Sequence, residues 1–390
     1  MRIACEVSRE APAPLARNFR AISRNHPFGA AQAALEGITA LQDGEDVKTE
    51  DMPLLQSAAA ASAERSAAQA QPLLPTGYFT HPFVERPSPQ SESPDQPVRI
   101  EALEERLIAS GIDAHLRRVE CGPAQRRDVC LAHDADYIDR LERASAGDEE
   151  ALASFDAPDA PVGPDTFACA MASAGAVVAA VDEVFARRIR NAFCAVRPPG
   201  HHAGRHRAAG FCYINSIAVG ALHAIERWAL DRVAILDFDA HHGDGTEEIV
   251  AGNPHIRFFS LFQWPLYPNR RLEPQPENVV ATPLAAGADG AALRRIVDEV
   301  WLPALSAWQP QAILLSAGFD AHVEERMAQL KASEVDFAYI TRRLVEAAGS
   351  LCGGRLVSVL EGGYAVRSLS RSVLTHLQML CRPTAEEVQS

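Results

Sequence analysis

The feature that most constrains the fold of this chain is a set of short, continuous apolar runs that end in glycine or in polar residues. In the order of the chain, these runs read NAFCAVRPPG, DRVAILDFDA, IRFFSLF, QAILLSAG and GRLVSVLEGG. Each is rich in Val, Ile, Leu or Phe, and its apolar residues do not alternate with polar ones. Such runs are typical of strands that are covered on both faces, so they predict a parallel sheet.

Amphipathic segments lie between the runs and predict helices. The expected helices cover about Ile100–Ser110, Thr166–Arg188, Asn215–Arg227, Ala291–Ala307 and Glu334–Ser350. Apolar residues make up 47% of the chain, which is enough for a large core. Because β and α segments alternate along most of the chain, the sequence predicts one α/β domain.

Residues 1–75 differ from the rest, because they are rich in Ala, Ser and Gln and contain an acidic patch, DGEDVKTED. They show no alternation that would build a sheet. We therefore expect a weakly ordered N-terminal extension, or a misplaced start with Met52 as the alternative initiator. From Thr76 a loop rich in Pro and Ser leads into the first helix. We expect one folded domain over residues 76–381 and a C-terminal tail over residues 382–390.

Charge and cysteine content narrow the range of partners. The chain carries 37 Lys and Arg against 51 Asp and Glu, a net charge of −14. Nucleic-acid binding needs clustered positive charge, so we expect no direct nucleic-acid binding, whereas cationic substrates are compatible with this charge. The eight cysteines include no CxxC pair, which favours free thiols and a cytoplasmic location. No apolar run approaches the about 18 residues of a membrane span, so we expect no membrane association. A homo-oligomer is compatible with these features.

Unusual residues, most of them polar, follow four of the predicted strands. They are His201 and His202 after the first, Asp237, Asp239, His241, His242 and Asp244 after the second, Asp320 after the fourth, and Gly362, Gly363 and Tyr364 after the fifth. Polar groups in such positions are costly to bury without partners. Ligands of open parallel sheets bind at the carboxyl ends of the strands, so these segments predict a functional site.

Three of these residues predict a metal centre. Asp239 and His241 are two apart on an extended strand end, where side chains point to the same side and can reach one cation. Asp320, at the tip of another strand, supplies a third ligand. Three ligands leave one coordination position open, as in catalytic zinc sites. We expect Zn²⁺, with Fe²⁺ or Co²⁺ as alternatives, because Asp and His ligands do not select strongly among these ions.

The remaining polar residues suit acid–base and electrostatic roles. His201 and His202 can act as acid and base, and Asp237 and Asp244 can each orient one imidazole. Tyr364 follows two glycines, whose flexible turn lets its hydroxyl approach a substrate oxygen and stabilise a tetrahedral oxyanion. Together with a metal ion, these residues predict hydrolysis of an amide.

Six motifs make the segment from about Thr76 to Cys381 resemble the zinc-dependent histone deacetylase family of the arginase/deacetylase superfamily, within it the bacterial and class II-like enzymes. The motifs are RPPGHHA (197–203), GFCYINS (210–216), LDFDAHHGDGT (236–246), SLFQWPLYP (260–268), SAGFDAH (316–322) and LEGGY (360–364). The resemblance implies an open three-layer α/β/α sandwich with a central, mostly parallel eight-stranded sheet. It also makes residues 76–381 a deacetylase catalytic domain.

The resemblance implies a role for each site residue. Asp239, His241 and Asp320 match the zinc ligands. Asp237 matches the carboxylate partner of His201, and Asp244 matches the partner of His202. Tyr364 matches the transition-state tyrosine. The residues that match the acyl-lysine tunnel are Phe211 and Tyr267 in its walls, Gly210 through its backbone, Met327 at its mouth and Asp159 at its rim. A structural K⁺ site is implied at Asp237, the backbone carbonyls of Asp239, His241 and Leu261, and the Ser260 hydroxyl.

The chain departs from the family pattern in loops around the expected tunnel mouth. Relatives usually carry Gly-Thr-Gly where this chain has Asn269-Arg270-Arg271, and often His where it has Phe262. Glu324-Glu325-Arg326-Met327 replaces an acidic-Asp-Pro-Leu sequence, and Ala365 follows the tyrosine where Asp or Asn is usual. None of these changes removes a metal ligand or the tyrosine. They therefore bear on substrate preference and leave the chemistry intact.

The expected substrate is the acetylated lysine side chain of a protein or peptide. Acetylpolyamine hydrolysis is the alternative, but Met327 stands where polyamine-selective relatives carry a glutamate, so we expect the lysine substrate to be preferred. A ureohydrolase with two Mn²⁺ ions needs a second carboxylate-rich cluster, and SAGFDAH supplies one carboxylate. The intact metal ligands, histidines and tyrosine argue against a binding protein that has lost catalytic activity.

Overall fold

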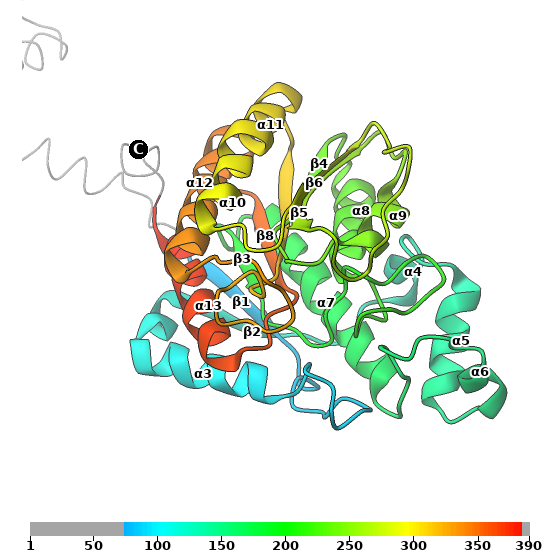
Figure 1. Cartoon of the computed structure of the whole chain (residues 1–390). Helices are drawn as coiled ribbons and strands as arrows, with labels where there is room; N and C mark the ends of the chain where they lie inside the picture. The colour runs from blue at the N-terminus through cyan, green and yellow to red at the C-terminus, as the bar shows by residue number, and fades with distance from the viewer. Residues whose placement is uncertain (1–73, 384–390) are drawn as a thin grey trace, which may run out of the picture. The chain divides into compact units, whose positions relative to one another are not determined.

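The computed structural model describes residues 74–383, drawn in colour in Figure 1. The expected N-terminal extension lies outside the described residues except for Leu74 and Pro75. The expected C-terminal tail lies outside them except for Arg382 and Pro383. The boundaries expected at residues 75 and 381 therefore stay predictions.

One sheet of eight strands forms the centre of the described residues. Its strands are β1 (Thr76–Thr80), β2 (Leu116–Glu120), β3 (Ala192–Cys194), β4 (Val233–Asp237), β5 (Ile256–Gln263), β6 (Val279–Leu284), β7 (Ala312–Ala317) and β8 (Leu356–Leu360). Their order is β2-β1-β3-β8-β7-β4-β5-β6, and every neighbouring pair is parallel. The predicted eight-stranded sheet is confirmed, and it is wholly rather than mostly parallel.

The five strands predicted from apolar runs form the contiguous middle of this sheet, β3-β8-β7-β4-β5. The sequence did not predict β1, β2 and β6, and the prediction of a loop from Thr76 is wrong for β1. Strands β2 and β6 lie at the two edges, where most of their residues are not buried. An edge strand with a partly exposed surface has no continuous apolar run to reveal it.

The helices, including short 3₁₀ and π segments, occupy the connections between the strands, except for the last helix, which follows β8. They are α3 (Val98–Ser110), η1 (Ile112–His115), α4 (Arg126–Val129), α5 (Ala135–Ser145), α6 (Glu149–Ala153), α7 (Thr166–Phe185), α8 (Ser216–Trp228), α9 (Asp244–Val250), α10 (Gly290–Ile296), η2 (Val297–Trp301), α11 (Leu302–Trp308), α12 (Glu334–Cys352) and α13 (Val366–Cys381). The helix predicted over Ala291–Ala307 is therefore α10, the π-helical η2 and α11 in succession.

Helices cover both faces of the sheet, which confirms the three-layer α/β/α sandwich (Figure 1). Along β4, Val233 and Ile235 pack in one hydrophobic core with residues of α7 and α8. Ala234 and Leu236 pack in the other core, with residues of α12 and α13. Alternate residues of one strand thus enter two different cores, and this is why the strand is apolar throughout.

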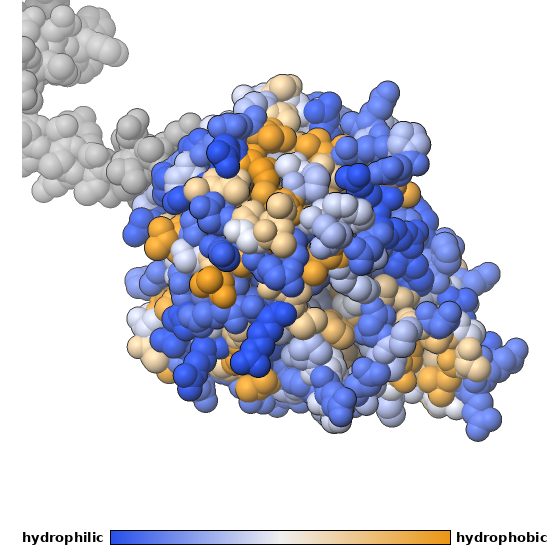
Figure 2. Space-filling view, in the orientation of Figure 1, coloured by the Kyte–Doolittle hydropathy of each residue, from blue (hydrophilic) through white to orange (hydrophobic). Residues whose placement is uncertain are grey.

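Helix α7 is the one described helix that is long and apolar enough to cross a membrane by length and composition. Of its most apolar window, 67% is buried inside the molecule, and its residues belong to the core beside β1 and β3. A helix that is apolar on all sides is expected in such a position. On the face of the molecule shown in Figure 2, hydrophilic residues predominate and apolar residues are scattered between them.

Asn215 links the start of α8 to the loop that carries the two adjacent histidines. Its side-chain oxygen accepts a hydrogen bond from the Ala218 amide at 3.0 Å, as expected of a helix N-cap. Its side-chain nitrogen donates to the Ala203 carbonyl, also at 3.0 Å. The helix therefore fixes the backbone directly after His201 and His202.

Candidate active site

The residues predicted to form the site meet at the carboxyl edge of the sheet. Since all strands are parallel, the loops that follow β3, β4, β7 and β8 leave the sheet at the same edge. A pocket of about 620 Å³ opens there. It is lined by Asp159, His201, His202, Gly210, Phe211, Asp239, His241, Tyr267, Met327 and Tyr364. Every one of these residues belongs to the set singled out in the sequence.

Asp239, His241 and Asp320 form a buried cluster that could hold a metal ion, and their candidate ligand atoms all lie within 4.8 Å of one another. His241 Nδ1 lies 2.8 Å from Asp320 Oδ2 and 3.1 Å from Asp239 Oδ1. Two carboxylates and one imidazole are a suitable donor set for a divalent transition ion. Among the residues that the structure describes, this is the one cluster of its kind.

Two glycines shape the space around this cluster. A Cβ atom on Gly318 would lie 1.9 Å from Asp239 Oδ2, and one on Gly362 would lie 2.4 Å from Asp320 Oδ2. The Gly362 amide donates to Asp239 Oδ2 at 2.8 Å, and the Ala240 amide donates to Asp320 Oδ1 at 2.7 Å. Backbone therefore approaches the carboxylates closely and orients them. The donor set and the space around it fit a bound metal ion.

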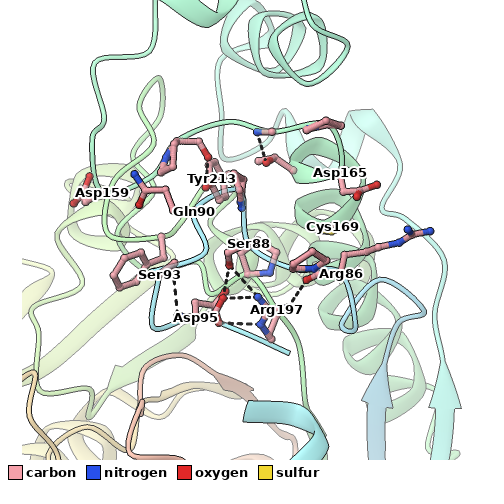
Figure 3. Close-up of a pocket in the computed structure, with 18 residues that line it drawn as sticks. Arg86, Ser88, Gln90, Ser93, Asp95, Asp159, Asp165, Cys169, Arg197 and Tyr213 are labelled. Atoms are coloured by element: carbon pink, nitrogen blue, oxygen red, sulfur yellow. Dashed lines mark hydrogen bonds and ion pairs between the residues drawn. The ribbon is translucent and has the colours of Figure 1, made fainter. Parts of the chain in front are cut away.

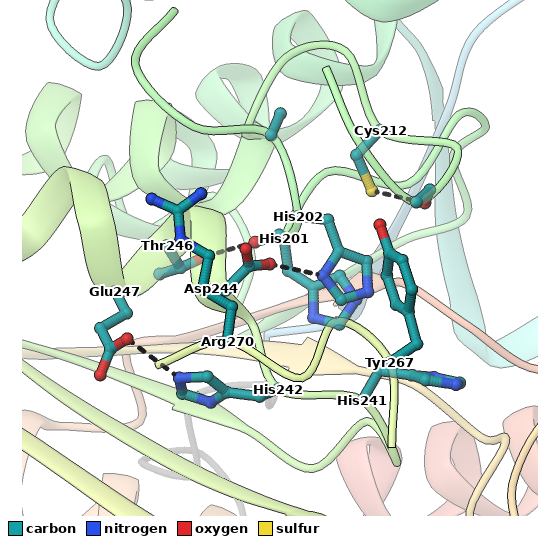
Figure 4. A network of polar contacts seen from close by, with 12 residues as sticks. His201, His202, Cys212, His241, His242, Asp244, Thr246, Glu247, Tyr267 and Arg270 are labelled. Carbon is teal, nitrogen blue, oxygen red and sulfur yellow. Dashed lines mark hydrogen bonds and ion pairs between the residues drawn. The ribbon is translucent and has the colours of Figure 1, made fainter. Parts of the chain in front are cut away.

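The two adjacent histidines have different carboxylate partners. His201 Nδ1 lies 2.9 Å from Asp237 Oδ2. His202 Nδ1 lies 2.9 Å from Asp244 Oδ1 (Figure 4). Asp244 is shared, because Arg207 donates to its second oxygen at 2.6 Å. Each contact occupies Nδ1, so Nε2 is the ring nitrogen that remains for proton transfer in the pocket. Nε2 of His201 also lies 3.9 Å from Asp239 Oδ2.

These surroundings shift the pKa values of the two imidazoles in opposite directions. Burial opposes a charge on His201, but Asp237 and Asp239 outweigh it and hold the pKa of His201 well above its ordinary value. Burial, and then the charge of His201, lowers the pKa of His202 to about 4. The environment therefore favours a charged His201 beside a neutral His202.

His242 does not take part in the pocket, although it belongs to the same strand-end motif. Its Nδ1 lies 3.0 Å from Ser260 Oγ, and its Nε2 lies 3.2 Å from Glu247, toward which the ring turns in Figure 4. Its ring packs on Phe262, with centroids 4.4 Å apart. Phe262 therefore forms part of the structural support for His242.

The two residues expected in the tunnel walls, Tyr267 and Phe211, both line the pocket. The Tyr267 ring lies edge-on to His202, with centroids 5.1 Å apart, and the Phe211 ring lies edge-on to Tyr364 at 5.7 Å. Asp159 connects the two walls, because its Oδ2 accepts hydrogen bonds from Tyr267 Oη at 2.6 Å and from the Gly210 amide at 2.9 Å. Aromatic walls of this kind suit a linear aliphatic stem.

Tyr364 is supported by a residue that the sequence did not reveal. Arg99, fully buried on α3, lies over the Tyr364 ring at 4.8 Å. It also donates to the carbonyls of Gly363 at 2.8 Å and Glu361 at 2.5 Å. Burial raises the pKa of Tyr364 well above its ordinary value, so its hydroxyl keeps its proton and remains a donor.

Glu361 is a second supporting residue, and its role was not visible in the LEGGY motif. Its Oε2 accepts from the amides of Gly200 at 2.7 Å and His201 at 3.2 Å, and its Oε1 accepts from Ser316 Oγ at 3.0 Å. Burial raises the pKa of Glu361 to about 7. It connects the loop after β3 to the ends of β7 and β8.

A second cavity of about 860 Å³ lies beside the pocket and shares Asp159 and Phe211 with it (Figure 3). Its wall includes the buried Arg197, which donates to Asp95 Oδ1 at 3.1 Å and to the Val84 carbonyl at 2.8 Å. Arg197 therefore fixes the Pro-rich loop that precedes α3. None of the expected metal ligands or histidines lines this cavity.

Comparisons with known proteins agree with the site. The histone deacetylase domain matches residues 93–380 of the chain. A probable deacetylase of Archaeoglobus fulgidus is 36% identical over 302 residues, which cover 73% of this chain and 80% of the relative. The histone deacetylase-like amidohydrolase of Pseudomonas aeruginosa is 34% identical over 299 residues, which cover 75% of this chain and 76% of the relative.

Other relatives are longer than this chain. The polyamine deacetylase HDAC10 of Mus musculus is 32% identical over 298 residues, which cover 73% of this chain and 44% of the relative. The chain spans 18% of the length of the type-2 histone deacetylase 2 of Dictyostelium discoideum.

A solved structure shares the fold. The HD domain of HDA15 superposes with a TM-score of 0.72 and 26% identity, covering 80% of this chain and 93% of that domain. The domain match covers well over half of the chain and includes the pocket residues. The chain therefore belongs to the histone deacetylase family, a family of amide hydrolases.

Proposed function

We propose that this protein hydrolyses the acetyl amide of acetylated lysine side chains in proteins or peptides. The observation that carries the proposal is the composition of one pocket. Two histidines with carboxylate partners, two of the three residues of a metal-type cluster, a tyrosine and two aromatic walls all line it. Each part has a separate use in amide hydrolysis, and together they leave no step without a residue.

Asp239, His241 and Asp320 would hold a divalent ion, with Zn²⁺ proposed ahead of Fe²⁺ and Co²⁺. Such an ion polarises a carbonyl and lowers the pKa of a bound water molecule. Among the chain's own groups, His202 takes the proton of the attacking water at Nε2, while Asp244 holds its Nδ1. His201 carries positive charge beside it or protonates the leaving amine.

Tyr364 and the aromatic walls complete the proposed reaction. The Tyr364 hydroxyl donates a hydrogen bond to the developing oxyanion, which it can do because it stays protonated. Phe211 and Tyr267 enclose the four-carbon stem of the lysine and exclude water from it. The products are acetate and a free amine.

The loop at the mouth supports acetyl-lysine over an acetylpolyamine. An acetylpolyamine would require a free carboxylate at the mouth to meet its second ammonium group. Met327, which lines the pocket, is apolar. Of the nearby acids, Glu324 pairs with Arg371 at 2.7 Å, and Glu325 accepts hydrogen bonds from backbone amides. Neither carboxylate is left without a partner.

Acetylpolyamine hydrolysis remains the second candidate, and two observations favour it. Asp159 brings a carboxylate to the pocket wall. In addition, two relatives, from Mus musculus and Homo sapiens, are named as polyamine deacetylases. Asp159 is engaged by Tyr267 and Gly210, so we rank this candidate second.

Measuring kcat/KM on an acetyl-lysine peptide and on N-acetylputrescine and N⁸-acetylspermidine separates the two candidates. We expect the peptide to be preferred. Met327→Glu should shift the ratio toward the polyamines, because it places a carboxylate at the mouth, whereas the control Met327→Leu should not. A preference of about tenfold for the acetylpolyamines, equal to about 1.4 kcal/mol, would promote the second candidate.

We also propose a structural K⁺ ion at Asp237, Ser260 and the carbonyls of Asp239, His241 and Leu261. In support, Asp237 and Ser260 are directly paired in the register of β4 and β5, so their side chains leave neighbouring strands at the same level. A cytoplasmic location is proposed on the free thiols of the described cysteines.

A further inference from the structure

One carboxylate joins two loops at the mouth of the pocket. The loop after β7 carries Met327, and the loop after β8 carries Tyr364. Glu325 Oε2 accepts hydrogen bonds from the amides of Tyr364 at 2.7 Å and Ala365 at 2.9 Å. Its Oε1 accepts from the amides of Arg326 at 2.8 Å and Met327 at 3.3 Å. A single side chain therefore satisfies backbone donors on both loops.

The loop that carries Tyr364 needs such support. Two glycines directly precede the tyrosine, and Gly363 has a φ of +116°, so the sequence of the loop does not by itself hold the tyrosine in one place. Arg99 holds it from the buried side through the Gly363 carbonyl and the tyrosine ring. Glu325 holds it from the outer side, at the amide of Tyr364 itself.

The loop of Glu325 has anchors that do not involve its carboxylate. The Val323 amide donates to the Ala332 carbonyl at 2.8 Å, and the Glu324 amide donates to His322 Nδ1 at 3.0 Å. Removing the Glu325 carboxylate should therefore leave its own loop in place and release the amide of Tyr364.

We propose that Glu325 is a positioning residue that acts through Tyr364. By holding the tyrosine backbone against the Met327 loop, it sets where the hydroxyl lies relative to the developing oxyanion. The proposal rests on the proposed function, because it requires Tyr364 to act in the reaction. A misplacement of about 1 Å at a reacting group can lower the rate by about a hundredfold.

The first test compares two neighbouring glutamates in the Zn²⁺-loaded protein with an acetyl-lysine peptide. Glu325→Ala should lower kcat by about tenfold or more, with a much smaller change in KM and unchanged metal content. The kcat of Glu325→Gln should lie between those of the parent and Glu325→Ala. The amide oxygen of Gln can accept hydrogen bonds from one loop, but its NH₂ group cannot accept them from the other. Glu324→Ala removes the same charge one residue away, and its kcat should stay within about twofold of the parent.

The second test combines Glu325→Ala with Tyr364→Phe. If Glu325 acts through the tyrosine hydroxyl, its removal should cause almost no further loss of kcat once that hydroxyl is gone. An equal loss in both backgrounds would overturn the proposal, and so would loss of metal from Glu325→Ala. If Glu325→Ala does not fold, the same comparison is made with Glu325→Gln. Full turnover of Tyr364→Phe alone would instead remove the proposed role of the tyrosine.

Discussion

At the scale of single residues, the site separates groups that face the substrate from groups that hold them. Tyr364 faces the pocket, while Arg99, buried on α3, fixes its ring and the preceding carbonyl. His202 faces the pocket, while Asp244 and Arg207 fix its Nδ1. Mutations in the two groups should therefore have different effects. Mutation of a residue that faces the substrate removes a chemical function, whereas mutation of a supporting residue misplaces the group that carries it.

Tyr364→Phe tests a chemical function directly. It removes one oxyanion donor, so kcat should fall by about 10²–10³ with metal content and KM nearly unchanged. Tyr339→Phe is a matched control, because Tyr339 lies on α12 and bonds Asp298, away from the pocket. Steady-state kinetics on an acetyl-lysine peptide check both variants. A kcat within about threefold of the parent would place Tyr364 outside the reaction.

The residues that face the pocket could be predicted, and so could Asp237 and Asp244 behind the histidines, but the supporting residues Arg99 and Glu361 could not. His201, Asp239 and Asp320 each follow an apolar run, where a polar side chain has few structural uses. Arg99 and Glu361 act instead on backbone groups that are brought close only by folding. Any residue can supply the backbone partner of such a hydrogen bond between side chain and backbone. The residue type at that position therefore shows no pattern from which the bond could be predicted.

At the scale of helices and strands, the same reasoning explains which strands could be predicted. Strands β4, β7 and β8 are buried on both faces, and their residues are fully apolar or nearly so. Strand β2, LRRVE, lies at an edge and carries two exposed arginines. Its place in the sheet depends on pairing with β1, which its composition does not reveal.

A buried histidine between α13, α12 and β8 makes stability depend on pH. His376 on α13 contacts Thr341 Oγ1 at 2.7 Å and Ser358 Oγ at 2.9 Å. Burial lowers the pKa of His376 to about 3, whereas an unfolded histidine has a pKa of about 6.5. Below about pH 6.5 the unfolded state therefore binds a proton that the folded state does not, and stability falls as the pH falls.

We expect the unfolding free energy to decrease by up to about 1.4 kcal/mol per pH unit from this histidine between about pH 6 and pH 4. His376→Gln should flatten the dependence, since glutamine does not titrate. His255→Gln, at an exposed position, is the control and should leave the slope unchanged. Urea unfolding at several pH values measures the slopes. An identical slope for His376→Gln and the parent would show that His376 does not cause this pH dependence of the unfolding free energy.

At the scale of the whole chain, all the residues that line the pocket in the structure lie within the described residues 74–383. Its lining residues run from Asp159 to Tyr364, and the histone deacetylase domain matches residues 93–380. Removal of residues 1–73 should therefore leave kcat/KM within about twofold of the full chain, since termini outside a site tolerate loss. The deletion keeps Pro75, whose carbonyl accepts from the Arg190 amide. A loss of tenfold or more on an acetyl-lysine peptide would show that the segment contributes to the site.

The central claim is that Asp239, His241 and Asp320 hold one metal ion on which amide hydrolysis depends. The most direct measurement is metal content and turnover of the purified protein, parent against Asp320→Ala, with Asp298→Ala as a control carboxylate away from the pocket. We expect about one transition-metal ion per chain in the parent and in the control. Asp320→Ala should lose both metal and turnover while the protein stays folded. Full metal content and full turnover in Asp320→Ala would contradict the account.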